Sequence, residues 1–239
     1  MKDYADLHTH TIASGHAYGT ITEMVHAAAL KNLPILGITE HAPSMPGSCG
    51  EMQFCNFKVI PPVLEGVRLL FGCELNIVDY KGTIDLSEKM LKRLSYTVVS
   101  LHDLCLKPGT MEDNTFAVLT ALKNPYVTIL GHPDDGRFPV DMKRLVSKAK
   151  KTGTLLEVNN SSLRPEGFRE NTKENCLRMV KECKEQGVMI VLGSDSHVDA
   201  DIAEYPYAEE ILRETDFPEK LVANVSLEKL KACIKHGKK

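Results

Sequence analysis

Seven of the nine histidines, one glutamate and one aspartate lie at or just after the ends of short apolar runs in the sequence. These nine residues are His8, His10, His16, His41, Glu74, His102, His132, Asp195 and His197. Imidazole and carboxylate groups without thiolates suit zinc, manganese or iron(II). The residue types therefore predict a site for divalent metal ions, whereas His26 and His236 are expected on the surface.

Two pairs among these residues have a spacing that suits joint binding of one ion. His8 and His10 are two residues apart, and Asp195 and His197 repeat this spacing. In an extended chain, residues two apart project from the same face, so both side chains of a pair can reach one metal. A single histidine at a strand end is more often a packing residue, but the joint placement of nine such residues favours a metal site.

The apolar runs are rich in Val, Ile and Leu, and polar segments with helical periodicity follow them, which is typical of repeated β/α units around a parallel sheet. The seven candidate strands are residues 4–9, 35–39, 69–75, 96–101, 127–131, 154–159 and 189–194. The candidate helices are residues 20–31, 87–94, 115–122, 141–152, 172–186, 207–213 and 227–236. Periodicity alone leaves a closed barrel and an open doubly wound sheet as alternatives.

In either fold, the carboxyl ends of parallel strands lie at one edge, where the loops converge and ligands bind. The nine candidate ligands are therefore expected to meet at this edge although they are remote in sequence. The loops at residues 42–52 and 107–114 are expected to shape the substrate pocket, and their sequences do not identify a leaving group.

The bulk composition narrows the class of protein. A length of 239 residues with 43% hydrophobic content predicts a single domain over residues 1–239. A net charge of −3, with only residues 235–239 as a basic cluster, gives no reason to expect a nucleic-acid partner. Without an apolar leader or a run of about 18 apolar residues, we expect a cytoplasmic protein with no membrane partner. The seven cysteines are scattered and predict no disulfide framework; a homo-oligomer is left open.

Several short motifs resemble, in order and spacing, those of the polymerase and histidinol phosphatase (PHP) family. They are Asp6-Leu7-His8-Thr9-His10, Thr39-Glu40-His41, Cys73-Glu74, Leu101-His102, Gly131-His132-Pro133 and Ser194-Asp195-Ser196-His197. The similarity is greatest to the small stand-alone bacterial phosphatases with three zinc ions, because His16 stands where other branches often have aspartate. One departure is Glu40, which stands where the family usually has aspartate.

The resemblance implies an α/β fold, a distorted TIM-like barrel of seven β/α units, with the metal site at the strand ends. It also implies a distribution of the ligands over three divalent ions. His8, His10, Glu74 and Asp195 surround one ion; Glu74 bridges to a second that His102 and His132 hold; and His16, His41 and His197 surround the third. Zinc is the expected metal, with manganese and iron as alternatives.

Such a cluster suits a metal-dependent phosphatase that acts on small phosphomonoesters. A metal-bound hydroxide would attack phosphorus, so no catalytic side chain beyond the metal ligands is expected. Other polar residues are candidates for orienting the ligands or binding the substrate. They are Asp6, Arg137, Asn159, Asn160, Arg164, Arg169, Ser194 and Ser196.

Other functions remain as alternatives at this stage. A histidinol-phosphate phosphatase, an amidohydrolase-type deacylase and a nuclease or phosphodiesterase would all use a similar cluster, although a nuclease should carry a basic track. A non-catalytic metal-binding scaffold is the alternative from another class. A serine hydrolase is disfavoured, because Asp195 occupies the serine position of the G-x-S-x-G pattern.

Overall fold

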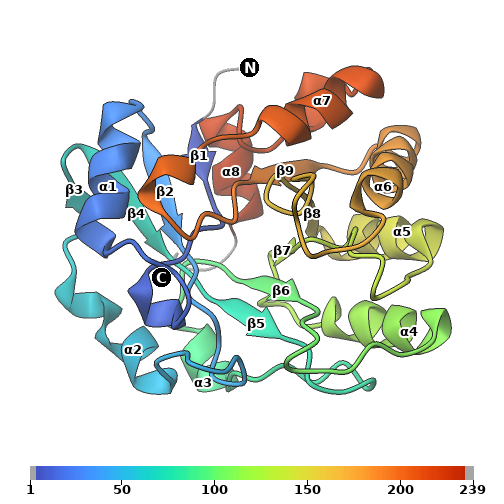
Figure 1. The fold of residues 1–239 in the computed structure, drawn as a ribbon, viewed down its shortest axis with the longest axis horizontal. Helices are drawn as coiled ribbons and strands as arrows, with labels where there is room; N and C mark the ends of the chain where they lie inside the picture. The colour runs from blue at the N-terminus through green and yellow to red at the C-terminus, as the bar shows by residue number, and fades with distance from the viewer. Residues whose placement is uncertain (1–3, 235–239) are drawn as a thin grey trace.

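The computed structural model describes residues 4–234, in which two neighbouring sheets form the centre of the molecule (Figure 1). One sheet has the order β1 (Ala5–Asp6), β2 (Ile35–Ile38), β4 (Val67–Phe71) and β3 (Val63–Leu64). The other has the order β5 (Glu74–Asn76), β6 (Val98–Ser100), β7 (Ile129–Leu130), β8 (Leu155–Asn159) and β9 (Ile190–Gly193). Only the pairing of β3 with β4 is antiparallel among these strands.

Backbone contacts at two seams join the sheets. At one seam, Thr9 forms a parallel bridge with Ser196, and the N–H of His10 donates to the Ser196 carbonyl at 2.8 Å. At the other, His41 forms a parallel bridge with Glu74, and the N–H of Ala42 donates to the Glu74 carbonyl at 2.9 Å. The fold is therefore the distorted α/β barrel that the resemblance implies, and both seams lie at candidate metal ligands.

The predicted strand over residues 69–75 is wrong in one respect, because the structure divides it at Gly72 into β4 and β5. β4 pairs with β2, whereas β5 pairs with β6. A Cβ atom at Gly72 would lie 3.0 Å from both Thr39 Cγ2 and the Tyr96 carbonyl oxygen. Glycine thus permits the close approach at which the chain leaves one sheet for the other, immediately before Glu74.

Helices lie around the outside of the strands (Figure 1). They are α1 (Ile21–Leu30), α2 (Glu51–Asn56), α3 (Glu88–Leu91), α4 (Met111–Ala121), α5 (Met142–Thr152), α6 (Thr172–Gln186), α7 (Pro206–Glu214) and α8 (Leu227–Cys233). The α6 bounds match the prediction, and α3 is shorter than predicted. None of the helices in the part of the chain that the structure describes has the length and apolarity that a membrane crossing requires.

One loop prediction and two helix predictions need correction. α2 begins inside the segment 42–52 that was predicted as a loop. α4 begins at Met111 rather than at residue 115, because the Thr110 hydroxyl accepts a hydrogen bond from the Asp113 N–H at 3.2 Å and caps the helix. α8 ends at Cys233, and the rest of the predicted helix, including His236, lies mostly outside the described residues, as does the basic cluster at 235–239.

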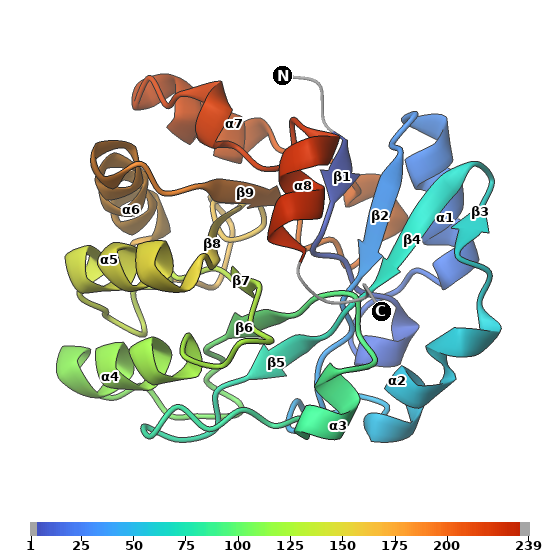
Figure 2. The same cartoon turned by 180° about the vertical axis from the view of Figure 1, so that it is seen from behind.

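Apolar side chains fill the barrel interior and the layer between strands and helices. The interior cluster includes Leu7, Tyr96, Val98 and Ile129, and the Tyr96 hydroxyl donates to the Leu7 carbonyl at 2.7 Å. Helix α8 adds Leu230 to this cluster and lies beside β1 and β9 (Figure 2). Cys176 and Cys183 are fully buried in the outer layer, whereas His26 is exposed, as expected.

Candidate metal centre

The structure brings all nine candidate ligands together at the rim of the barrel. Their positions follow the strands: His8 and His10 after β1, His16 after the short helix η1 (Ile12–Ser14), His41 after β2, Glu74 at the start of β5, His102 after β6, His132 after β7, and Asp195 and His197 after β9. Seven of the imidazole rings are linked by ring-to-ring contacts with centroid separations of 4.3–6.1 Å. The predicted convergence of these residues is therefore present.

Glu74 lies at the centre of the cluster, with 1% of its side chain exposed. Its Oε2 atom is 3.4 Å from Nε2 of His8, 3.4 Å from Nε2 of His10 and 2.8 Å from Nδ1 of His41. Its Oε1 atom is 3.2 Å from Nε2 of His102 and 3.0 Å from Nε2 of His132. The two carboxylate oxygens therefore face different sets of imidazoles, which is the arrangement of a bridging ligand.

The atoms around Glu74 Oε2 have the separations of ligands that share one ion. Oδ1 of Asp195 is 3.5 Å from Nε2 of His8 and 3.3 Å from Nε2 of His10, and both nitrogens are 3.4 Å from Glu74 Oε2. Bonds of about 2.0–2.1 Å to a tetrahedral zinc ion place neighbouring ligand atoms roughly 3.3 Å apart. The donor set His8, His10, Glu74 and Asp195 thus fits a single divalent ion.

Buried polar atoms without hydrogen-bond partners support the same fit. Within residues 4–234, they include His8 Nε2, His10 Nε2, His41 Nδ1 and Glu74 Oε2. Leaving such atoms unpaired in the protein interior costs about 1–3 kcal/mol each. Coordination to metal ions would satisfy all four atoms at once.

The third predicted set, His16, His41 and His197, lies on the open side of the cluster. Nε2 of His16 is 3.3 Å from Nε2 of His41, and the rings of His16 and His197 are 4.9 Å apart. The ligand atoms of His10, His41 and His197 also lie within 4.8 Å of one another. The three sets therefore adjoin and form one continuous cluster rather than three separate sites.

The electrostatic environment keeps Glu74, Asp195 and His16 in the protonation states that metals bind. Burial alone would raise the pKa of Glu74, but the imidazoles of His102 and His8 outweigh it and hold this pKa well below its usual range. At Asp195, too, burial alone would raise the pKa, but the imidazoles of His8 and His10 outweigh it and hold this pKa well below its usual range. Burial and the neighbouring His41 and His197 rings lower the pKa of His16 to about 4.

Glu157 is a buried acid in β8 that the sequence analysis missed. Its Oε1 atom is 2.7 Å from Nδ1 of His8, and its Oε2 atom accepts a hydrogen bond from the His132 N–H at 2.8 Å. The carboxylate fixes the His8 ring so that Nε2 faces Glu74 and Asp195. A glutamate inside the apolar run Leu155-Leu156-Glu157-Val158 was the available signal, because a buried charge needs a specific partner.

Similar contacts orient three other rings. The Ser14 hydroxyl donates to Glu40 at 2.6 Å, so its oxygen accepts from Nδ1 of His10 at 2.9 Å. Nδ1 of His102 is 2.7 Å from Oδ1 of Asn76, and Nδ1 of His197 is 2.9 Å from the Asp195 carbonyl. Each contact leaves Nε2 directed to the cluster. Glu40, the departure from the family motif, thus acts on His10 through Ser14.

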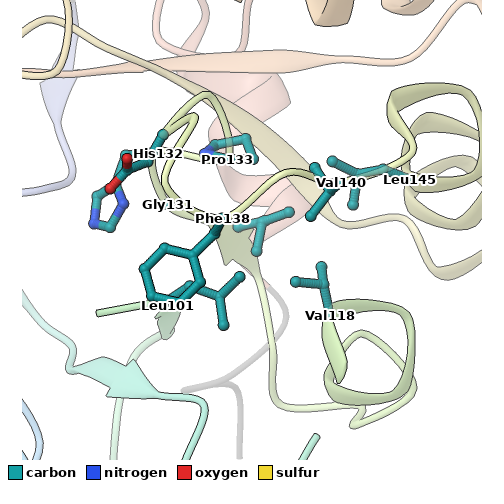
Figure 3. A pocket seen from close by; sticks show the side chains of 10 residues that line it. Leu101, Val118, Gly131, His132, Pro133, Phe138, Val140 and Leu145 are labelled. Carbon is teal, nitrogen blue, oxygen red and sulfur yellow. The ribbon is translucent and has the colours of Figure 1, made fainter. Parts of the chain in front are cut away.

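Two candidate ligands have backbone conformations that non-glycine residues rarely adopt. His132 has φ of 28° and Asp195 has φ of 53°. Such conformations cost free energy and are concentrated at functional sites. Figure 3 shows the His132 ring turned away from a small apolar pocket that is lined by Phe138, Val140 and Leu145. Apolar side chains thus lie behind the loop, while the His132 ring faces Glu74 and His102.

The polar residues predicted around the ligands have different contacts. Asn159 Nδ2 donates to Asp195 Oδ2 at 3.2 Å. Asp6 accepts from the backbone N–H groups of His8 and Ser194, both at 3.3 Å, and therefore acts on the chain rather than on ligand side chains. Asn160 contacts the backbone instead, because its Oδ1 accepts from the Tyr207 and Ala208 N–H groups at the start of α7.

The hydroxyls of the two serines beside Asp195 bond to the backbone. Ser194 Oγ donates to the His8 carbonyl at 3.4 Å, and Ser196 Oγ donates to the Val198 carbonyl at 2.5 Å. They support the strand end that carries Asp195 rather than the ligand side chains.

An open cavity of about 550 Å³ lies over the cluster. Its walls include His16, His41 and His102 from the cluster, and the three predicted arginines, Arg137, Arg164 and Arg169. Arg164 pairs with Asp201 at 2.8 Å. The three guanidiniums lie in the wall of this cavity next to the candidate metal centre, and each of them is paired with an aspartate.

A barrel with histidine and carboxylate ligands gathered at its rim defines the class of metal-dependent hydrolases. The sequence matches the PHP domain over residues 6–160. It is 44% identical over 238 residues to a probable phosphatase of Acetivibrio thermocellus, covering 100% of this chain and 98% of that protein. A probable phosphatase of Clostridium novyi is 45% identical, covering 98% and 96% of the two chains. The chain therefore belongs to the PHP domain family.

A solved structure has the same fold at low sequence identity. Histidinol phosphate phosphatase from Lactococcus lactis, in complex with zinc, L-histidinol and phosphate, superposes with a TM-score of 0.59 at 14% identity. The alignment covers 90% of this chain and 95% of that one. This similarity is evidence for the fold alone.

Proposed function

We propose that the protein hydrolyses small phosphomonoesters at a cluster of three divalent metal ions. The enzyme class follows from the family: full-length relatives at about 44% identity are named probable phosphatases, and the chain is a metal-dependent phosphatase. The observation that carries the finer proposal is the position of Glu74, whose two oxygens face two different sets of imidazoles. His16, His41 and His197 supply the third set.

Zinc is the ion that we assign to this cluster, with manganese or iron as alternatives. The donors are imidazoles and carboxylates, and the described cluster contains no thiolate. The Lactococcus lactis enzyme was solved with zinc. When bound, divalent ions would supply positive charge for phosphoryl oxygens and an activated water for attack on phosphorus.

The chain's own residues orient these ligands and position the substrate. Glu157, Ser14 and Asn76 hold the rings of His8, His10 and His102 by their Nδ1 atoms. Among the three cavity arginines, Arg169 contacts the candidate ligand Asp195, so its guanidinium is the one that we assign to the substrate phosphoryl group.

The cavity wall favours a different leaving group from that of histidinol phosphate. L-histidinol carries an ammonium group, which a free carboxylate would recognise. Among the described residues of this wall, Asp103 is paired with Arg137 at 2.7 Å and Asp201 with Arg164 at 2.8 Å. We therefore place histidinol phosphate second, behind neutral or anionic phosphomonoesters, with the Lactococcus lactis complex as the observation in its favour.

The test is hydrolysis of para-nitrophenyl phosphate by zinc- or manganese-loaded protein, with bis(para-nitrophenyl) phosphate and L-histidinol phosphate in parallel. We expect the monoester to be hydrolysed, the activity to be lost on chelation, and added metal to restore it. Hydrolysis restricted to the diester would contradict the proposed substrate class. Bound metal without hydrolysis of any ester would instead support a non-catalytic scaffold.

A further inference from the structure

Phe168 has an aromatic side chain that is 72% exposed at the mouth of the cavity, in the loop between β8 and α6. Two guanidiniums lie over its ring: the Cζ atom of Arg137 is 5.0 Å from the ring centroid and that of Arg169 is 5.3 Å from it. Both distances fall within the range of cation–π interactions. One exposed ring therefore connects an arginine of the β7–α5 loop to an arginine beside the metal centre.

Arg137 is held firmly by two aspartates. Its Nε and Nη2 atoms donate to Asp135 at 3.1 Å and 2.7 Å, and its Nη1 atom donates to Asp103 at 2.7 Å. Its side chain is 19% exposed. All three of its guanidinium nitrogens are thus engaged, two of them at the 2.7 Å typical of strong charge-assisted hydrogen bonds, so Arg137 has little capacity left for a ligand.

Arg169 is held more loosely. Within residues 4–234, its hydrogen bonds are two contacts of 3.3 Å, from Nη1 and Nη2 to Oδ2 of Asp195. Charge-assisted hydrogen bonds of this kind are usually about 2.7–2.9 Å long. The side chain is 8% exposed and lines the cavity beside His16 and His102. A guanidinium has five N–H donors, so Arg169 retains donors for an oxyanion that enters the cavity.

We propose that Phe168 is a positioning residue for the Arg169 guanidinium. Its ring contacts both this guanidinium and the fixed Arg137 side chain, and it thereby holds Arg169 in place to bind the substrate phosphoryl group. The inference rests on the proposed function, because it needs a phosphate in the cavity. A stacked guanidinium loses less conformational freedom when it forms bidentate hydrogen bonds, since its plane is already fixed. Removal of the ring should therefore weaken phosphate binding and leave the metal centre unchanged.

The experiment compares Phe168→Leu, which removes the π face, with Phe168→Tyr, which retains it. We expect Phe168→Leu to raise the KM for para-nitrophenyl phosphate by about 5- to 10-fold, the effect of losing two exposed cation–π contacts, while kcat changes less than about twofold. The Kd of inorganic phosphate, measured by calorimetry on zinc-loaded protein, should rise by the same factor. Phe168→Tyr should restore both values, and zinc per chain should be unchanged.

Two further variants separate positioning from a general structural role. Phe116→Leu replaces a phenylalanine of α4 that is 52% exposed and should leave both constants unchanged. In an Arg169→Met background, Phe168→Leu should have no further effect, because the group that it positions is gone. Unchanged phosphate affinity in Phe168→Leu, or an equal loss in the Arg169→Met background, would overturn the inference.

The two proposals have different modes of failure. Zinc-loaded wild-type protein that binds phosphate in a Phe168-dependent manner but hydrolyses no monoester would contradict the proposed function and support the role of Phe168. Hydrolysis of monoesters with the same KM in wild type and Phe168→Leu would contradict the role of Phe168 and support the proposed function.

Discussion

Replacement of Glu74 by glutamine should abolish nearly all phosphatase activity, with kcat lower by about 10³-fold or more. Glutamine has nearly the same shape but no charge, and only one of its two terminal atoms can bind a metal. The carboxylate faces His8 and His10 with one oxygen and His102 and His132 with the other. We therefore expect two of the three ion sites to be impaired together.

The readouts are zinc per chain by plasma emission spectrometry and kcat for para-nitrophenyl phosphate at saturating zinc. Zinc should fall from three ions per chain to about one, the ion that His16, His41 and His197 hold in our proposal. Glu228→Gln, on α8 and remote from the rim, is the matched control and should behave as wild type. A Glu74→Gln protein with three ions and more than a tenth of the activity would contradict the bridging role.

Glu157→Gln should weaken metal binding by about 10- to 100-fold, the usual effect of removing a group that orients metal ligands. The carboxylate accepts hydrogen bonds from His132 N–H and Asn159 Nδ2 and lies 2.7 Å from Nδ1 of His8. A glutamine at this position would place its NH2 group opposite His8 Nδ1, the His132 N–H or Asn159 Nδ2, so that two hydrogen-bond donors would face each other. The His8 ring or the His132 backbone would then lose its fixed orientation.

A competition titration with a zinc chelator measures this effect, and activity should return in part when zinc is in excess. Glu182→Gln, in α6 on the outside of the barrel, is the control for loss of a glutamate charge. If Glu157→Gln retained wild-type zinc affinity, the contact with His8 would have no role in the metal centre.

The convergence of the nine candidate ligands was predictable because strand ends in a β/α fold share one edge. The sequence has each of these residues at or near the end of an apolar run. The spacings of His8 and His10 and of Asp195 and His197 do not depend on how long the preceding strand is. β1 has only two residues and β7 has two, both shorter than predicted. The convergence of these side chains was therefore easier to predict than the lengths of the strands that carry them.

Other features depend on tertiary contacts that no local pattern contains. Gly72 divides one apolar run into two strands because the backbone approaches Thr39 and Tyr96 closely. Glu157 stands out locally as an acid inside an apolar run, but its partner, His8, is identified only when β8 lies beside it, 149 residues away in the sequence. Phe168 was not singled out either, because an exposed phenylalanine in a loop has no meaning until Arg137 and Arg169 are seen above its ring.

Anomalous diffraction at the zinc edge, from crystals of zinc-loaded protein, tests the metal cluster most directly. We predict three peaks at the barrel rim, each within about 2.0–2.3 Å of its ligand atoms, with Glu74 between two of them. Peaks elsewhere on the surface, or a rim without any peak in protein that hydrolyses phosphomonoesters, would contradict the assignment of these nine side chains to a catalytic metal centre.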